Sequence, residues 1–423
     1  MSLPNVVCLA IDRLHVGYLG AYGNTWIRTP AFDRLATESF VWDRVTIDSP
    51  DLAMQYRSLW LGLHALCPEN RGAARATLVE RLNAAGYYSV LLTDEPTLAE
   101  DALASQFEER VVIGSDAARG GVEVAQAVEE TDAARFFAAA CDWLGSAREP
   151  FFLWLHTGTL GRVWDAPIEF REEYRDDDDP PAEFWADIPN RRLPESFDPD
   201  ELLAITHAYA GQVTLVDQLL GLFLDALDET GLAEGTLFVL FAPRGFPLGE
   251  HRRVGPCDEA IYSELVHVPW MWRLPSDNER TGRSEALVQP ADLYATILEE
   301  CGIGAAGQLT AGEGKSILPL AHGQSPAAFD RACVVGPVGQ RGIVVPAWSL
   351  RLSERPDAAA EQIARTELFA KPDDWFEVNE VSDRCPEIAQ QLEATFSAFS
   401  DACRSGVPAE PATLPEELTV GIE

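Results

Sequence analysis

Short apolar runs separated by longer amphipathic stretches set the pattern of this chain. Strands are predicted at five runs, Val6–Ile11, Ser89–Thr93, Phe151–His156, Thr236–Ala242 and Val268–Trp272. Apolar residues recur at helical spacing over residues 122–146 and 199–230, and Asp198 before Pro199 marks the start of the second helix. Strands that alternate with helices predict an α/β fold, in which helices cover both faces of a large, mostly parallel sheet.

The character of the chain changes in its last quarter. Short strands are predicted at Ala332–Val335 and Ile343–Leu352, around a glycine-containing turn, and a closing helix over residues 384–403. This pattern predicts a small α+β subdomain with antiparallel strands over residues 326–423, whose last twenty residues, rich in Pro and Glu, form an acidic tail. The main α/β domain then covers residues 1–325.

Acidic residues dominate the chain, and one insertion concentrates them. Asp and Glu number 68 against 32 Lys and Arg, which gives a net charge of −36 at pH 7. Such a surface repels nucleic acid and anionic lipid, so an anion-binding site must be built locally. Residues 166–198 form an acidic insertion that includes the run Asp176 to Asp179. This run lacks the ligand spacing and the turn glycine of a calcium loop, and we interpret it as a solvated loop.

The remaining composition favours a cytoplasmic protein. No apolar run approaches the 18 residues that span a membrane, and the N-terminus lacks the basic stretch and cleavage site of a secretory signal. The eight cysteines lie far apart, without a CxxC pair or zinc-site spacing, and reduced thiols are the expected state.

Polar residues follow three of the predicted strands directly. Asp12 follows the first strand, His156 ends the third, and Pro243-Arg244 follows the fourth. Because sites in parallel sheets form at the carboxyl ends of the strands, we expect these side chains on one edge of the sheet.

Several segments resemble, in order, the signatures of the sulfatase family of the alkaline-phosphatase superfamily. They are Asn5 to Asn24 with Thr29 to Leu35, Ser49 to Gly62, Pro150 to His156, Tyr209 to Asp217, Gly245 to His251, Val268-Pro269, Ala286 to Leu293, Gly314 to Ser316, and Glu367 to Val381. The resemblance implies a sulfatase fold over nearly the whole chain. It also implies sulfate-ester hydrolysis, by a cysteine or serine oxidised to formylglycine, a calcium ion, and Lys, His and Arg side chains that hold the sulfate.

The nucleophile position of the resembling motif is occupied by Leu52. The family segment begins with Ser-Pro, as at Ser49-Pro50, and continues as C-x-P-S-R, so Leu52 aligns with the nucleophile and Tyr56 with the arginine. Leucine cannot be oxidised to formylglycine or act as a nucleophile. Arg57, one residue later, is a candidate substitute for the arginine.

The ligand positions for calcium are similarly replaced. The family's Asp-Asp pair stands here as Asp12-Arg13, and its Asp-His or Asp-Asn before glycine stands as Pro243-Arg244. Only Asp12 keeps a ligand, and the fixed charge of arginine opposes a divalent cation. We therefore expect neither calcium nor formylglycine, and we expect Asp12 to pair with Arg13 or Arg244.

Two further polar positions of the family are lost. The D-P-H that follows the third strand stands as Thr159-Leu160-Gly161, and the lysine of GEHxxxGK stands as Pro256. His251 of the same segment is retained.

Three functions remain open for such a chain. The first is a catalytically silent protein whose surviving residues maintain the fold, alone or as an assembly subunit of unknown oligomeric state. The second is a binding protein in which Arg13, Arg57 and Arg244, with Asp12 and His251, hold a sulfated or phosphorylated small molecule or glycan. The third is a hydrolase with a relocated centre, for which the candidates are Ser49, Ser58, His64 and His156.

Overall fold

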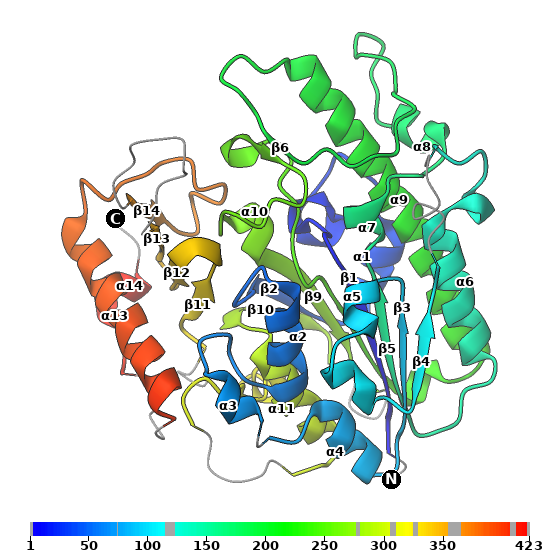
Figure 1. Ribbon diagram of the computed structural model, residues 1–423, viewed down its shortest axis with the longest axis horizontal. Coiled ribbons are helices and arrows are strands. Elements are labelled where there is room, and N and C mark those ends of the chain that lie inside the picture. The colour runs from blue at the N-terminus through cyan, green and yellow to red at the C-terminus, as the bar shows by residue number, and fades with distance from the viewer. Residues whose placement is uncertain are drawn as a thin grey trace. The chain divides into compact units, whose positions relative to one another are not determined.

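The chain divides into two compact units in a computed structural model, whose ribbon is shown in Figure 1. The structure describes residues 3–73, 75–114, 123–275, 280–304, 310–324, 329–353, 365–406 and 412–420. The first unit comprises Met1–Val41, Leu82–Cys257 and Val268–Arg283, and the second comprises Trp42–Arg81, Asp258–His267 and Ser284–Glu423. The domain boundary predicted between residues 325 and 326 lies outside the described residues.

A largely parallel sheet forms the centre of the first unit. Within this unit the strand order is β9-β7-β1-β5-β3-β4, and the strands are β1 (Asn5–Ile11), β3 (Tyr88–Thr93), β4 (Glu109–Val112), β5 (Phe151–Thr157), β7 (Thr236–Phe241) and β9 (His267–Arg273). All neighbours are parallel except β9, which runs antiparallel to β7. Every residue of β1, β5 and β7 is buried, which explains why these strands are continuous apolar runs. The five strand predictions are confirmed.

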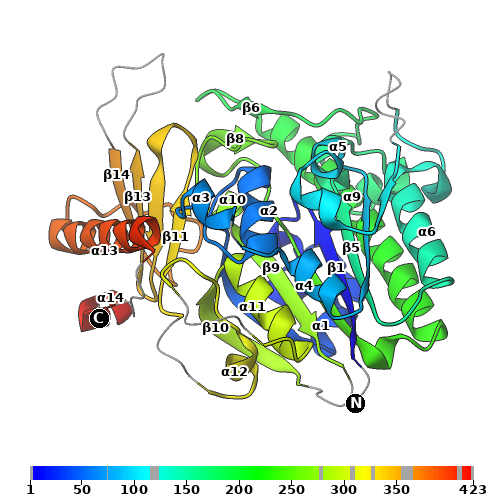
Figure 2. The same ribbon diagram turned by 60° about the horizontal axis from the view of Figure 1, so that its bottom comes forward.

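Three helices of the first unit pack together on one face of this sheet (Figures 1 and 2). They are α1 (Pro30–Thr37), α6 (Asp132–Leu144) and α9 (Pro199–Glu229). Phe223 of α9 contacts Phe238 of β7 and Phe137 of α6, at ring-centroid distances of 6.1 and 6.4 Å. Among the described residues only α9 is long and apolar enough to cross a membrane, but 67% of its apolar window is buried, as in a core helix.

The helix predicted over residues 122–146 is shorter than expected. It begins at Asp132, because the side chain of Thr131 accepts a hydrogen bond from the Ala134 amide and so caps the first turn. Glu123 instead forms an isolated bridge with Trp185, and residue 122 lies outside the described residues.

The acidic insertion is only partly solvated, although the loop predicted within it is present. Asp176, Asp177 and Asp178 are exposed as predicted, but Arg171 is 1% exposed. Its guanidinium donates hydrogen bonds to the carbonyls of Trp164, Glu183 and Trp185.

The other short elements of the first unit are α5 (Pro96–Ala99), α7 (Thr159–Arg162), α8 (Ile168–Glu172), the pair β6 (Arg191–Arg192) and β8 (Arg253–Val254), and the 3-10 turns Val16–Tyr18, Gly20–Tyr22, Leu103–Gln106, Val128–Glu130, Ala233–Gly235 and Glu250–Arg252.

The second unit contains a four-stranded antiparallel sheet with the long helix α13 packed against it (Figure 2). Its strands are β11 (Ala332–Val335), β12 (Arg341–Val344), β13 (Trp348–Ser353) and β14 (Arg365–Ala370). Leu392 and Phe396 of α13 (Pro386–Ser405) share a buried core with Ile343 and Leu350. The remaining elements are β2 (Phe40–Thr46) and β10 (Gly282–Val288), within which the chain passes between the units, and α2 (Leu52–Leu61), α3 (Glu69–Gly72), α4 (Leu78–Ala84), α10 (Ser263–Val266), α11 (Ala291–Glu300), α12 (Leu318–Ala321), the 3-10 turn Pro337–Gly339 and α14 (Glu416–Thr419).

Two predictions for this region are wrong in detail. Ile343–Leu352 is not one strand, because the chain turns between β12 and β13 at a segment that contains Pro346. The C-terminal segment is not wholly a tail, since Leu418 of α14 is fully buried and its carbonyl accepts a hydrogen bond from the Ala347 amide. Residues 407–411 and 421–423 of the predicted tail lie outside the described residues.

Candidate active site

The carboxyl ends of four neighbouring parallel strands meet at one edge of the first unit's sheet. In the order β7, β1, β5 and β3, these ends carry Arg244, Asp12, His156 and Asp94. Backbone hydrogen bonds extend the strand pairing into this edge, from the Asp12 amide to the Thr157 carbonyl and from the Asp94 amide to the His156 carbonyl. The sequence argument for Asp12, His156 and Arg244 is therefore confirmed, and Asp94, which obeys the same rule directly after β3, was missed.

Asp12 is held by a two-point ion pair with Arg244. The Nε and Nη2 atoms of Arg244 lie 3.1 and 2.5 Å from the two carboxylate oxygens, and Nε of Arg13 lies 3.9 Å from Oδ2. Burial alone raises the pKa of Asp12, but the charge and hydrogen bonds of Arg244, together with Arg13, outweigh it and lower the pKa to about 2. The pairing predicted for Asp12 is present, and its carboxylate stays ionised.

Arg13 adopts a strained backbone conformation that its neighbours stabilise. Its φ is 67°, in the left-handed region that few residues other than glycine adopt. The Tyr209 hydroxyl donates to the Arg13 carbonyl at 2.7 Å and accepts from the His15 amide at 2.8 Å. Tyr209 stacks on Phe246, with ring centroids 5.1 Å apart, so this hydroxyl is rigidly placed.

The side chain of Arg13 lies against Gly161. A Cβ atom at Gly161 would fall 2.6 Å from Cγ of Arg13, closer than non-bonded carbon atoms approach. Arg13 is 2% exposed, so its side chain has little room to move away. Arg13 in this position therefore requires glycine at position 161.

His156 is a neutral side chain at the centre of the strand ends. It is fully buried, and burial, with smaller effects of Arg244 and Arg162, lowers its pKa to about 4. The negative charges of Asp12 and Glu95 oppose this shift without cancelling it. At neutral pH His156 therefore adds no positive charge to the site.

Asp94 closes the other end of the site. Its carboxylate accepts hydrogen bonds from the Thr157 hydroxyl at 2.8 Å and the Gly158 amide at 2.7 Å, and Nη1 of Arg162 lies 3.9 Å away. Burial outweighs these partners and raises the pKa of Asp94 to about 6. Its negative charge is therefore partly lost just below neutral pH.

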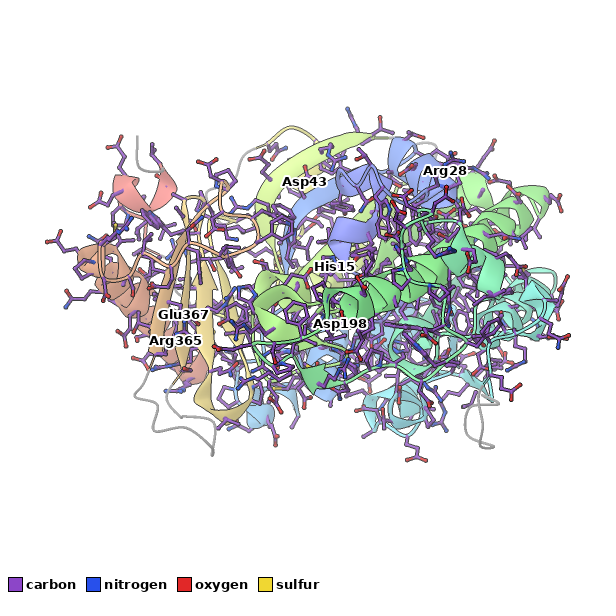
Figure 3. The ribbon with its side chains drawn as sticks, turned by 90° about the horizontal axis from the view of Figure 1, so that it is seen from above. His15, Arg28, Asp43, Asp198, Arg365 and Glu367 are labelled. Atoms are coloured by element: carbon purple, nitrogen blue, oxygen red, sulfur yellow. The ribbon has the colours of Figure 1, made fainter. Side chains whose placement is uncertain are left out.

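A second polar pair follows β1 and was not predicted. His15 (labelled in Figure 3) accepts a hydrogen bond from the Gly17 amide at Nδ1, so its other ring nitrogen, Nε2, faces Glu250 at 3.7 Å. Burial raises the pKa of Glu250, but His15 outweighs burial and the pKa is lowered. His251, a predicted site residue, lies in the same turn with a left-handed backbone, at φ 49°.

The other predicted residues belong to the second unit, where they have local partners. Nη2 of Arg57 donates to the Pro68 carbonyl at 2.9 Å. Leu52 is the first residue of α2, whose N-terminus is capped by the Asp51 side chain.

The relocated hydrolase centre gains no support from these contacts. The Ser58 hydroxyl donates to Asp48 at 2.6 Å. Nδ1 of His64 accepts from the Leu66 amide at 3.0 Å, and Nε2 lies 2.9 Å from the Cys333 carbonyl. Both ring nitrogens of His64 thus face backbone groups, and a general base for Ser58 needs one of them.

The arrangement around Asp12 does not fit a divalent cation. Both carboxylate oxygens face guanidinium nitrogens of Arg244, and Pro243 offers no side-chain ligand. Over the described part of the chain, no group of three or more His, Cys, Asp and Glu side chains converges as a metal site would require.

Comparison with known proteins defines the family of this chain. The family profile described as Sulfatase matches residues 4–303. The chain belongs to the sulfatase family. It is 25% identical over 209 residues to an endo-4-O-sulfatase of Bacteroides thetaiotaomicron, a match that covers 44% of this chain and 39% of that protein. It is 30% identical over 132 residues to the multifunctional alkaline phosphatase superfamily protein PehA of Trinickia caryophylli, covering 30% of this chain and 24% of PehA.

The matched segments thus span about a quarter to two fifths of these curated relatives.

Solved structures confirm the fold of this sulfatase-family chain. The phosphonate monoester hydrolase of Agrobacterium radiobacter superposes with a TM-score of 0.75 at 15% identity, covering 95% of this chain and 96% of the hydrolase. The complex of BT4656 with its substrate D-glucosamine-2-N,6-O-disulfate gives 0.74 at 15% identity, covering 96% and 99%. At this identity the likeness establishes the predicted alkaline-phosphatase/sulfatase fold and nothing about activity.

Proposed function

We propose that this sulfatase-family protein binds a sulfate or phosphate monoester at the carboxyl ends of β1 and β7 and does not hydrolyse it. One observation carries the proposal. The guanidinium groups of Arg13 and Arg244 both form ion pairs with the single carboxylate of Asp12. Two cationic side chains thus lie beside one carboxylate in a chain whose net charge is −36.

The same ion pair supports the absence of hydrolysis. The family's calcium neutralises the ester oxygens, and here Arg244 engages the carboxylate that would bind it. In the motif that resembles the family signature Leu52 aligns with the nucleophile, and leucine provides no attacking atom. A guanidinium can bind an ester sulfate in two-point fashion, but it cannot supply the missing nucleophile.

The names of the relatives suggest the class of ligand. One relative is an N-acetylglucosamine-6-O-sulfatase of Bacteroides thetaiotaomicron, 28% identical over 127 residues, and the substrate of BT4656 is a sulfated glucosamine. We therefore favour a sulfated sugar over a nucleotide or a lipid phosphate as the ligand of this chain.

Titration calorimetry with N-acetylglucosamine 6-sulfate tests the proposal, with unsulfated N-acetylglucosamine as the matched ligand. The protein should bind the sulfated sugar and not the unsulfated one, without release of sulfate measured by ion chromatography. Arg244→Lys keeps the charge but loses the two-point geometry, so it should weaken binding about tenfold, which corresponds to ~1.4 kcal/mol.

Two outcomes would overturn the proposal. Equal heats with both sugars, or with neither, would show that the site does not recognise this sulfate ester. Release of sulfate by the wild-type protein but not by Asp12→Asn would show a working hydrolase instead. A thermal melt of each variant separates a loss of binding from a loss of the fold.

A further inference from the structure

Two cysteines far apart in the sequence meet in the second unit, remote in the chain from every residue of the proposed ligand site. Cys67 follows α2, and Cys403 lies in the last turn of α13. A Cβ atom built on Gly312 would lie 2.4 Å from the Cys67 sulfur and 2.8 Å from the Cys403 sulfur. The two sulfurs therefore cannot be further apart than the sum of these distances.

Glycine at position 312 is required by both the backbone and the sulfurs. Its φ of +79° lies in the left-handed region, and any side chain would overlap the sulfur of Cys67. The Gly312 carbonyl accepts a hydrogen bond from the His64 amide, and Leu63 pairs with Glu313 in an isolated bridge. These contacts fix the segment that lies against both sulfurs.

A guanidinium group distinguishes the two thiols. Nη1 of Arg71 lies 3.3 Å from the sulfur of Cys67, whereas it meets Cys403 only at the carbonyl oxygen, at 2.8 Å. Arg71 is fixed by a further hydrogen bond to the Ala311 carbonyl and by Glu313. The neighbouring Cys403 thiol and the charge of Arg71 lower the pKa of Cys67 against the effect of burial, whereas Cys67 and burial raise the pKa of Cys403. Cys67 is the sulfur that carries the negative charge when one proton leaves the pair.

We propose that Cys67 and Cys403 form a redox-active dithiol, in which Cys67 is the nucleophile and Cys403 the resolving thiol, and that the pair closes to a disulfide when hydrogen peroxide reaches it. The Cys67 thiolate attacks one peroxide oxygen and the O–O bond breaks. Cys67 becomes a sulfenic acid, and the hydroxide that leaves takes up a proton. The Cys403 thiol then attacks that sulfur, and water leaves as the S–S bond forms. In total two thiols are oxidised and one hydrogen peroxide is reduced to two waters.

The test is to map thiols of the full-length protein after graded exposure to hydrogen peroxide, by mass spectrometry of alkylated peptides. None of the eight cysteines is in a disulfide in the structure, and Cys141 and Cys385 are more exposed than Cys67. Burial raises the pKa of Cys141. Exposure alone therefore predicts that Cys141 is oxidised first, whereas thiolate character predicts that Cys67 is. We expect a disulfide-linked peptide pair containing Cys67 and Cys403, formed before Cys141 or Cys385 is modified.

Variants identify the order of the two steps. In Cys403→Ser, Cys67 should accumulate as a sulfenic acid that dimedone traps, and in Cys67→Ser, Cys403 should remain a thiol at the same peroxide dose. Cys141→Ser is the matched control and should leave the disulfide unchanged. The rate of Cys67 alkylation by iodoacetamide should be half-maximal at a pH below the ordinary thiol value of about 8.5. Modification of Cys141 or Cys385 while Cys67 and Cys403 stay reduced would overturn the proposal, as would an unchanged rate at Cys403 in Cys67→Ser.

Discussion

The buried carboxylate of Asp12 depends on Arg244 for its neutralisation. A carboxylate that is 4% exposed is costly unless it is paired, and Arg244 provides the pair through two hydrogen bonds. Its position directly after a buried strand was predictable from the sequence, because the rule concerns strand ends. The contact between Arg13 and Gly161 was not predictable, because it depends on where α7 lies after folding.

Removing the charge of Asp12 should destabilise the protein strongly. Asp12→Asn leaves Arg244 and Arg13 beside a neutral amide, and we expect the free energy of unfolding to fall by about 3 kcal/mol. Chemical denaturation at pH 7 measures this loss. Asp176→Asn, on an exposed aspartate, is the control and should change stability by less than about 0.5 kcal/mol. Equal stability of the two variants would mean that the ion pair is not important for the fold.

Gly161 should tolerate no larger residue while Arg13 is present. Gly161→Ala is expected to lower the free energy of unfolding by about 1–2 kcal/mol, because its Cβ would overlap Cγ of Arg13. Gly221→Ala, also within a helix, meets its nearest neighbour at 3.5 Å and should be neutral or stabilising by up to ~1 kcal/mol. In an Arg13→Ala background the cost at position 161 should disappear, and its persistence there would refute the steric explanation.

His156 should make stability depend on pH. Its folded pKa of about 4 lies below the ordinary value of about 6.5, so the unfolded chain takes up the proton first as the pH falls. The contribution of neutral His156 is complete above pH 6.5 and is lost toward pH 4. Asp94, with a folded pKa of about 6, acts in the opposite direction between pH 4 and 6, because its folded form favours the proton.

A comparison with His156→Gln isolates the contribution of the histidine. Relative to this variant, the wild-type protein should lose roughly 3 kcal/mol of unfolding free energy between pH 7 and pH 4. A stability difference that stays constant over this range would contradict a depressed pKa for His156.

At the scale of elements, the sequence predicts best the strands that are buried on both faces, because each of them must be a continuous apolar run. The strands β1, β5 and β7 are buried along their whole length, so their apolar runs coincide with their bounds. Bounds set by local polar contacts were harder to predict, as the start of α6 at the Thr131 cap shows. The acidic C-terminal segment was misjudged because two buried leucines, Leu414 and Leu418, determine its packing among many exposed charged residues.

Leu418 tests whether this segment belongs to the fold. Leu418→Ala removes a fully buried side chain and should lower the free energy of unfolding by about 3 kcal/mol. Val420, two residues later, is 56% exposed, so Val420→Ala should change stability by less than about 0.5 kcal/mol. Urea denaturation of both variants distinguishes a packed segment from a tail, for which the two substitutions would be equally mild.

At the scale of the whole molecule, the chain has a sulfatase fold although Arg244 engages Asp12, the residue that the family resemblance aligns with a calcium ligand. The fold depends on apolar strands and helix packing, which the substitutions at positions 13, 161 and 244 leave intact. Hydrolysis depends on a metal and a nucleophile, which require particular side chains. Under the proposed function this chain keeps the first without the second, so we expect its ligand to be found by binding measurements rather than by turnover.

Bound calcium is the most direct test of this account. The protein is equilibrated with calcium and separated from unbound ions, and its metal content is then measured by mass spectrometry beside that of Asp12→Asn. With Arg244 on both oxygens of Asp12, we predict far less than one calcium ion per chain in the wild-type protein and no difference between the two proteins. One tightly held ion per chain, lost in Asp12→Asn, would show that Asp12 is a metal ligand and that hydrolysis must be reconsidered.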